Sequence, residues 1–291
     1  MIAFITSLRN PLNSDSYERV EKLLMETLAS VCAQTDKDFV VIVVGNRAPT
    51  FALPNKVHFV PVDFPPTSAV AGPRTEIGPF VWDKGTKIGV GLAFARQFKP
   101  DQVMIFDADD FVSNRIAEYA NARPSADGWV IADGWMYSGS RKVFRKIQDF
   151  NRVCGTCYVI PFAAYAVPED LAVNATQQDI AEAFGDRLYR ILGAHREAVA
   201  WHREHGRHLE PLPFRGAVYH VDTGENHSGY SMQGIGRPST PSLRREFGVP
   251  DKSSLLASLW RSIYVGSPRV IAGKIVARVR RLVSSRQEGP A

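Results

Sequence analysis

Runs of apolar residues alternate with amphipathic stretches over the first 121 residues of the chain. Four apolar segments have the length and composition of buried strands: 2–8, 39–44, 57–60 and 103–106. Residues 17–33 place apolar side chains at helical spacing, and residues 83–98 form a second expected helix that contains several glycines. Because strands that alternate with helices form right-handed crossovers, we predict an α/β fold. It is Rossmann-like, with a mainly parallel central sheet and helices on both faces.

The pattern loosens after residue 121. Short strands are expected at 129–132, 135–144, 155–160, 209–212 and 217–221, the first two as antiparallel additions to the sheet. Residues 176–205 are predicted to be largely helical, and a polar loop follows at 222–229. We interpret 1–121 and 122–250 as two halves of one domain, followed by a separate helical tail, 251–291.

Three carboxylates, Asp107, Asp109 and Asp110, directly follow the strand predicted at 103–106. Carboxylates this close repel one another, so they need a cation or generous solvation. Ligand sites of open α/β sheets lie at the carboxyl ends of the strands, which favours a divalent metal site here. The alternative is a solvated turn in which Asp109 or Asp110 caps a helix that begins near Ser113. The cluster by itself leaves both interpretations open.

The composition of the chain indicates where the protein is located and which partners it has. The chain has 291 residues, a net charge of +5 and three cysteines, which are too few for a disulfide framework. No signal peptide and no membrane-spanning run is evident. We therefore expect a cytoplasmic protein with no nucleic-acid partner.

The tail has a different character from the rest of the chain. Residues 261–287 carry seven basic side chains and no acidic one, beside an apolar stripe of Ile271, Ile275, Val279 and Leu282. This pattern is typical of a basic amphipathic helix at an anionic membrane surface, which predicts peripheral binding to the inner face of the membrane. The alternative is a helix docked on the protein's own acidic domain or on a partner subunit.

Several separated motifs resemble the family 2 glycosyltransferases. They are the run Leu-Ala-Ser-Val-Cys-Ala-Gln-Thr at 28–35, the apolar strand 39–44, the glycine-containing helix that ends in Ala95-Arg96, and Asp107-Ala108-Asp109. The resemblance is closest over residues 1–115. It implies a GT-A fold, a nucleotide-sugar donor, most readily a UDP-sugar, and a divalent cation such as Mn²⁺ or Mg²⁺. Oxygen ligands suit these cations.

The resemblance also implies roles for individual residues. Asp109 matches the direct metal ligand, Asp107 matches the carboxylate that faces the ribose and the metal, and Asp110 is expected to cap the next helix. The base is expected between the first loop and the end of the second strand, at Thr6, Leu8, Arg9 and Asn46. Asn46 replaces an acidic residue usual in the family, so the identity of the base stays open.

Donor contacts are also expected at the start of the glycine-containing helix. Asp83, Lys84 and Lys87 are placed there, where the helix N-terminus favours anions. One of the two lysines would meet the base or the diphosphate; the alternative is that both are solvated.

The second half of the chain must complete the site. By resemblance, His220 or His227 would be the third metal ligand. The general base would be Asp186, with Asp170 as the second choice, although either could simply cap a helix. His195 and the histidines after it lack the spacing of a zinc site, and the Cys154–Cys157 pair enters a strand, which disfavours a redox role.

These observations together predict a metal-dependent glycosyltransferase of the hexosyltransferase type. It would act on a glycan or glycolipid acceptor in surface polysaccharide or glycolipid assembly. Two other functions are considered: a nucleotidyltransferase, and an inactive glycosyltransferase-like scaffold of a membrane-associated complex. The first loop, Ser7-Leu8-Arg9-Asn10, contains no glycine, which counts against the nucleotidyltransferase.

Overall fold

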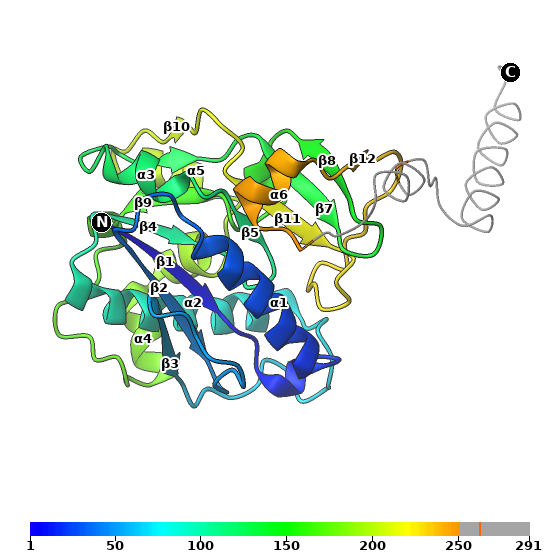
Figure 1. Cartoon of the computed structure of the whole chain (residues 1–291). Helices are drawn as coiled ribbons and strands as arrows, with labels where there is room; N and C mark the ends of the chain where they lie inside the picture. Colours follow the sequence, from blue (N-terminus) through cyan, green and yellow to red (C-terminus); the bar gives the residue numbers. More distant parts are fainter. Residues whose placement is uncertain (251–261, 263–291) are drawn as a thin grey trace, which may run out of the picture.

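The computed structural model of the chain (Figure 1) describes residues 1–250 and residue 262. The predicted basic membrane-binding helix of the tail lies outside the described residues. Within them, no helix combines the length and the apolar character needed to cross a bilayer.

The main sheet contains seven strands in the order β10-β6-β9-β4-β1-β2-β3. Its first four strands along the chain are parallel: β1 (Ile2–Ser7), β2 (Phe39–Gly45), β3 (Val57–Pro61) and β4 (Gln102–Ile105). The strand β9 (Tyr158–Pro161) pairs antiparallel with β4, and β6 (Trp129–Val130) pairs antiparallel with β9. The short β10 (Glu210–Pro211) closes the edge, parallel to β6. The predicted α/β fold, a mainly parallel sheet with antiparallel additions, is confirmed.

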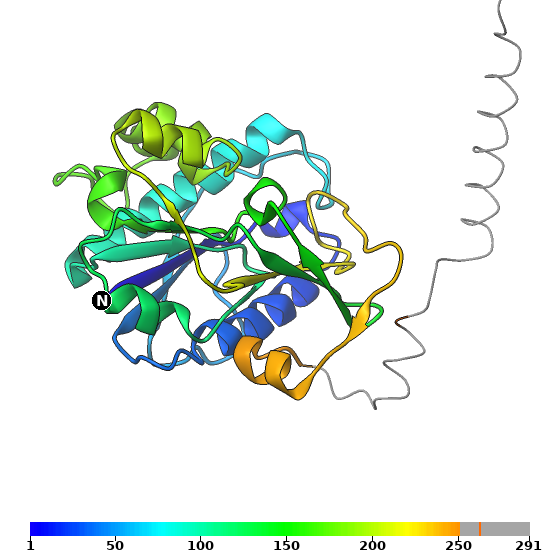
Figure 2. The ribbon, with the colours of Figure 1, turned by 90° about the horizontal axis from the view of Figure 1, so that it is seen from above.

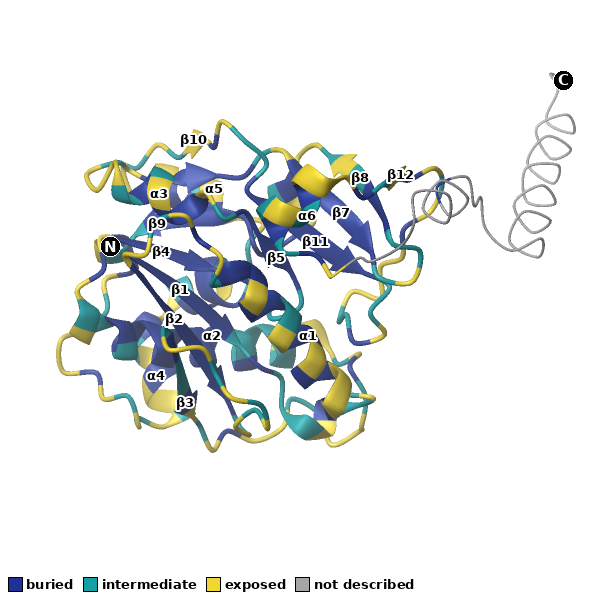
Figure 3. Cartoon of the chain, in the orientation of Figure 1, coloured by how far each residue is buried: buried dark blue, intermediate teal, exposed yellow. Residues whose placement is uncertain are grey.

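Two long helices cover opposite faces of this sheet, as Figures 1 and 2 show for α1 (Tyr17–Val31) and α2 (Ile77–Ala95). The side chain of Ser16 caps α1 by accepting a hydrogen bond from the Arg19 N–H. The helix α2 packs so closely on the sheet that a Cβ at Gly91 would lie 2.5 Å from the Ile5 side chain. The strands between the helices are almost wholly buried (Figure 3), which explains their unbroken apolar sequences.

The start of α2 differs from the prediction. The helix begins at Ile77 and not at Asp83, because Pro79 falls in the first turn, where a missing N–H is tolerated. Lys84 and Lys87 therefore lie in the second and third turns. The predicted contribution of a helix N-terminus to anion binding by these residues is wrong.

A second sheet of five strands packs beside the first, in the order β12-β8-β7-β11-β5. Its strands are β5 (Phe111–Val112), β7 (Gly134–Ser138), β8 (Val143–Ile147), β11 (Ala217–Val221) and β12 (Arg237–Pro238). The region 135–144 was expected to extend the main sheet and instead forms the β7–β8 hairpin here. The reason is a separate aromatic core, in which Phe111, Tyr137 and Phe144 pack together.

The helical region predicted at 176–205 consists of three pieces: α4 (Gln177–Phe184), the π-helical turn η5 (Leu188–Leu192) and α5 (Ala198–Glu204). Gly185 ends α4 with a positive φ of 51°. Shorter helices are α3 (Ile116–Asn121) after β5 and α6 (Pro241–Phe247) after β12. The main sheet joins strands from both sides of residue 121, and the division of the domain at this residue stays a prediction.

Candidate functional site

A cavity of about 590 Å³ opens at the carboxyl ends of β1 and β4. Besides these strand ends, its walls include α2, the segment 67–75, the segment 189–197 that starts in η5, and the loop 225–228. Eight of the predicted site residues line it: Leu8, Arg9, Asp83, Lys84, Asp107, Ala108, Asp109 and His227. The fold thus collects into one place residues that are more than 200 positions apart.

Asp107 leaves β4 and forms an ion pair with Lys84 of α2. The two side chains are 30% and 13% exposed. The Asp107 backbone N–H donates to the Thr156 hydroxyl at 2.9 Å. Burial raises the pKa of Asp107, but the adjacent Lys84 ammonium outweighs burial and holds this pKa below its ordinary value.

Asp109 also lines the cavity. Its Oδ2 accepts a hydrogen bond from the Asn226 amide at 3.0 Å. Burial and the negative charge of Asp107 raise the pKa of Asp109 to about 6, so repulsion between the two carboxylates is not fully relieved by the protein itself. A divalent cation between them would relieve it. The carboxylate oxygens of Asp107 and Asp109 therefore fit a hard cation such as Mg²⁺ or Mn²⁺.

Asp110 does not cap the following helix, and the prediction that it does is wrong. The helix α3 begins at Ile116 with Arg115 at its cap position. Asp110 is fully buried, and its carboxylate accepts hydrogen bonds from the Thr156 hydroxyl at 2.6 Å, the Cys154 thiol at 3.0 Å and the His220 backbone N–H at 3.0 Å. These three donors come from β11 and from the segment just before β9. Asp110 therefore joins the two sheets beneath the cavity.

The potential ligand atoms of Asp107, Asp110 and Cys154 lie within 4.8 Å of one another, close enough to hold a metal ion together. The thiol, however, is protonated and donates a hydrogen bond to Asp110. Burial raises the pKa of both Cys154 and Cys157 well above the ordinary value, which disfavours thiolate chemistry. The two cysteines thus act as packed thiols beside the acidic cluster.

Of the two candidate histidines, His227 is the one in the cavity. Its Nε2 donates to the Thr75 carbonyl at 2.9 Å, and its ring stacks on Phe80 with 4.0 Å between centroids. Because Nε2 carries the proton, Nδ1 has the free lone pair that a metal needs. His220 turns its ring away, against Phe111 and Tyr137, and its Nδ1 donates to the Asp109 carbonyl at 3.1 Å.

The loop that carries His227 is fastened to the first loop by Glu225, a residue that sequence reasoning missed. The buried Glu225 carboxylate accepts hydrogen bonds from the backbone N–H groups of Asp15 and Ser16. Arg9 donates to the Glu225 carbonyl and lies 3.8 Å from the Glu225 carboxylate. Nothing in the local pattern around Glu225 indicates these partners, which lie more than 200 residues away.

Lys87 supports the site from behind. It is fully buried and donates to the Asp83 carboxylate at 2.8 Å and to the Leu8 carbonyl at 2.9 Å. Burial lowers its pKa. This geometry connects α2 to the first loop and leaves Lys87 outside the cavity lining, in contrast to Lys84.

Four other predicted residues do not line the cavity: Thr6, Asn46, Asp170 and Asp186. Thr6 is buried in β1, and the Asn46 amide donates to the Phe64 carbonyl at 2.7 Å. Asp170 and Asp186 are both exposed. The geometry does not bring either carboxylate to the acidic strand tip, so the general-base role stays a prediction that their positions do not favour.

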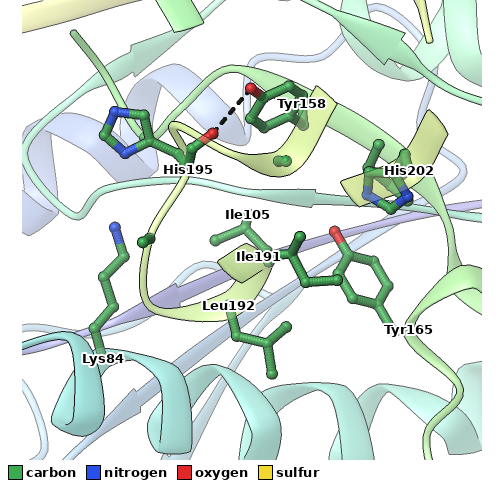
Figure 4. A pocket seen from close by; sticks show the side chains of 12 residues that line it. Lys84, Ile105, Tyr158, Tyr165, Ile191, Leu192, His195 and His202 are labelled. Atoms are coloured by element: carbon green, nitrogen blue, oxygen red, sulfur yellow. Dashed lines mark hydrogen bonds between the residues drawn. The ribbon is translucent and has the colours of Figure 1, made fainter. Parts of the chain in front are cut away.

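His195 is a second residue that sequence reasoning passed over. It lines the large cavity and also a small one of about 20 Å³, the size of one water site, shown in Figure 4 with Lys84 and Tyr158. The Tyr158 hydroxyl donates to the His195 carbonyl at 3.0 Å. Burial and the nearby Lys84 charge lower the pKa of His195 to about 4, so its ring is neutral at pH 7.

No protein-family model matches the chain, and no curated protein matches it either. Among solved structures, it is similar to S. aureus TarS 1–349, with 15% identity and a TM-score of 0.38, over 75% of this chain and 60% of that one. This chain thus spans less than two thirds of the TarS structure.

Two further solved structures are similar over most of their own length. One is a 2-C-methyl-D-erythritol 4-phosphate cytidylyltransferase from Thermus thermophilus, with 14% identity and a TM-score of 0.33, over 90% of this chain and 98% of that one. The other is described as a candidate nucleotide-diphospho-sugar transferase from Desulfovibrio desulfuricans, with 10% identity and a TM-score of 0.32, over 75% and 80%. Because these TM-scores are low, the fold is assigned from the strand order described above. The site is likewise described from its own geometry.

Proposed function

We propose that this protein is a metal-dependent glycosyltransferase that moves a sugar from a nucleotide sugar to a hydroxyl acceptor. The observation that carries the proposal is the meeting of Asp107 and Asp109, at the tip of β4, with Arg9, Lys84 and His227 in one cavity. The sequence resemblance to family 2 glycosyltransferases covers the same strand tip. The open parallel sheet places the cavity where such folds bind nucleotides.

The charges around the cavity support a need for a cation. The basic side chains of the lining are Arg9, Lys84, Arg190 and Arg196, and the acidic ones are Asp83, Asp107, Asp109, Glu197 and Glu225. Carboxylates therefore outnumber basic groups, and most of the basic groups already have acidic partners. The excess of one carboxylate is offset by Lys87, which pairs with Asp83 from outside the lining. Few positive charges are therefore free to bind a strongly negative nucleoside diphosphate, and a divalent cation would supply the missing charge.

Asp109 and Asp107 would hold the Mn²⁺ or Mg²⁺ ion, and we propose His227, which lines the same cavity, as a further ligand through its Nδ1. When bound, the ion stabilises the charge that develops on a diphosphate leaving group. The protein's own residues perform the other tasks. Arg9 and Leu8 border the part of the cavity beside the first loop, where the base would lie, and Glu225 keeps this loop and the His227 loop together.

The test is calorimetric titration of UDP, GDP, CDP and ADP into the full-length protein, with and without Mn²⁺. We expect one nucleoside diphosphate, UDP foremost, to bind at least about tenfold more tightly with Mn²⁺. A UDP-hexose should then be consumed slowly in the presence of a hydroxyl acceptor. If no nucleotide gains affinity from Mn²⁺ or Mg²⁺, the proposal is wrong and an inactive scaffold becomes the better interpretation.

For the residues beyond the described part, we propose peripheral binding to anionic membranes, which would bring the site to a glycolipid acceptor. The basic composition of 261–287 supports this proposal. Flotation with anionic vesicles should recover the full-length protein, whereas a chain that ends at Gly266 should stay at the bottom of the gradient. Equal recovery of the two would remove the membrane proposal without touching the enzymatic one.

A further inference from the structure

We propose that Lys84 is an internal counter-ion of Asp107: it competes with the divalent cation in the free protein and pairs with the donor's diphosphate once the cation has taken Asp107. This inference rests on the proposed function and deepens it. In this proposal, Lys84 is the residue that couples metal binding to nucleotide binding.

The first step is the position of Lys84 relative to the metal ligands. Its ammonium is paired with Oδ1 of Asp107, one of the two carboxylates that would bind the cation. A positive charge at this place repels a divalent cation and occupies one of its ligand atoms. A cation that binds Asp107 without a nucleotide therefore competes with the Lys84–Asp107 pair and weakens it.

The second step is the contrast between Lys84 and Lys87 on the same helix. Lys87 is fully buried and has two partners, the Asp83 carboxylate and the Leu8 carbonyl. Within residues 1–250, the contacts of the Lys84 ammonium comprise one hydrogen-bond partner, Asp107. An ammonium that loses such a partner in a mostly buried place is costly, so Lys84 needs a new anion when Asp107 is taken.

The third step is room to move. The Lys84 side chain lines the small cavity, shown in Figure 4, and also the large one. Gly155 lies against the ion pair: a Cβ there would be 3.1 Å from the Lys84 Nζ and 2.9 Å from the Asp107 Oδ2. A side chain at 155 would collide with the pair, so the glycine allows Lys84 and Asp107 to lie where they do. The large cavity, where the diphosphate would bind, provides the space into which the ammonium could turn.

These steps predict a specific thermodynamic pattern. In the native protein the cation alone binds weakly, and cation and nucleotide strengthen each other, because the diphosphate accepts the displaced ammonium. Lys84→Met keeps the length of the side chain and removes the charge. We expect it to bind Mn²⁺ alone roughly tenfold more tightly and to lose roughly tenfold of the UDP-induced gain in Mn²⁺ affinity.

The experiment measures free Mn²⁺ by electron paramagnetic resonance, with and without UDP, for the full-length native protein, Lys84→Met, Lys84→Gln and Lys84→Arg. Lys84→Arg keeps the charge and should retain most of the coupling. Lys22→Met, on the exposed side of α1, controls for the loss of any lysine. Thermal unfolding of each variant shows that it is folded, and Lys84→Gln replaces Lys84→Met should the latter fail to fold.

Two failures are distinguishable. If UDP does not raise the Mn²⁺ affinity of the native protein, the proposed function itself fails. If the native protein shows this coupling and folded Lys84→Met or Lys84→Gln shows the same coupling and the same affinity for Mn²⁺ alone, only the role of Lys84 is overturned.

Discussion

The two sides of the candidate site are built in different ways. On one side, Arg9, Asp107 and Asp109 follow directly from strands of the parallel sheet, and Lys84 projects from a helix packed on it. On the other side, Asn226 and His227 belong to a loop whose contacts with distant segments are made by side chains, through Glu225 with the start of α1 and through His227 with Thr75. The register of the sheet determines where the end of a strand lies, whereas the position of a loop depends on the contacts of its individual residues.

The two sides meet at Asp109. Its carboxylate comes from the strand side, and the Asn226 amide reaches it from the loop. Its neighbour Asp110 turns the opposite way, into the contact between the two sheets. One of two adjacent carboxylates therefore faces the cavity and the other faces the core, and the following experiments separate their roles.

Asp109→Ala should have the largest effect. Removing this carboxylate takes away a metal ligand, so Mn²⁺-dependent UDP binding and sugar transfer should fall on the order of 10³-fold. The midpoint of thermal unfolding of the metal-free protein should not fall, because repulsion with Asp107 disappears. A variant that keeps Mn²⁺-dependent transfer would contradict the assigned metal site.

Asp110→Ala should affect stability instead of ligand affinity. The change leaves the buried Thr156 hydroxyl and the His220 N–H without their acceptor, which costs about 2–4 kcal/mol of the free energy of unfolding. Denaturant unfolding in the absence of metal measures this loss. Unchanged stability would show that Asp110 is not the link between the sheets that its hydrogen bonds indicate.

The pH dependence of metal binding should follow Asp109. Its pKa of about 6 in the folded protein is raised above the unfolded value, so the folded state holds this proton more firmly, and the proton competes with the cation. Mn²⁺ affinity should fall about tenfold per pH unit below pH 6 and level off above it.

The same titration has a consequence for stability. The protonated Asp109 side chain contributes to the free energy of unfolding. This contribution is fully present at low pH and is lost as the pH rises through about 6 in the metal-free protein. Asp109→Asn should remove this decline from thermal unfolding recorded between pH 4 and pH 7. A native protein with the same profile as Asp109→Asn would assign the titration to another group.

The histidine pair tests the loop side. His227→Ala should weaken Mn²⁺-dependent UDP binding about tenfold, because a ligand and its stacking on Phe80 are lost. His220→Ala should leave this affinity unchanged and lower stability, because its ring fills the core between Phe111 and Tyr137. Calorimetric titration of UDP with Mn²⁺ into both variants distinguishes the two histidines. A loss of affinity in His220→Ala, with no loss in His227→Ala, would identify His220 as the ligand.

The smallest effects are expected at Asp170 and Asp186. Both are exposed and lie outside the cavity lining, so alanine at either position should change the rate of transfer less than about twofold. A loss of a hundredfold or more at one of them would identify it as the general base and would require the region around η5 to move toward the acceptor. Initial rates at saturating donor are the suitable measurement.

The N-terminal part of the fold was predictable because its signals are local. Unbroken apolar runs form the buried strands β1, β2 and β4, and the three carboxylates after β4 must emerge at the carboxyl end of the sheet. The boundary of α2 was missed by six residues, because Pro79 suits the first turn of a helix as well as a loop. Because the helix begins six residues earlier than predicted, Lys84 lies inside it and not at its end. There its side chain pairs with Asp107.

By itself, then, the sequence determined the parallel sheet, its acidic tip and the residues of the first loop, since each depends on neighbours within a few positions. Only the tertiary structure decided which carboxylates and which histidine line the cavity and which lysine pairs with Asp107. Those choices depend on partners such as Thr156, Glu225 and Thr75, which are distant in the chain. No local pattern records such contacts, because hydrogen bonds and ion pairs of this kind form only after the two sheets have packed.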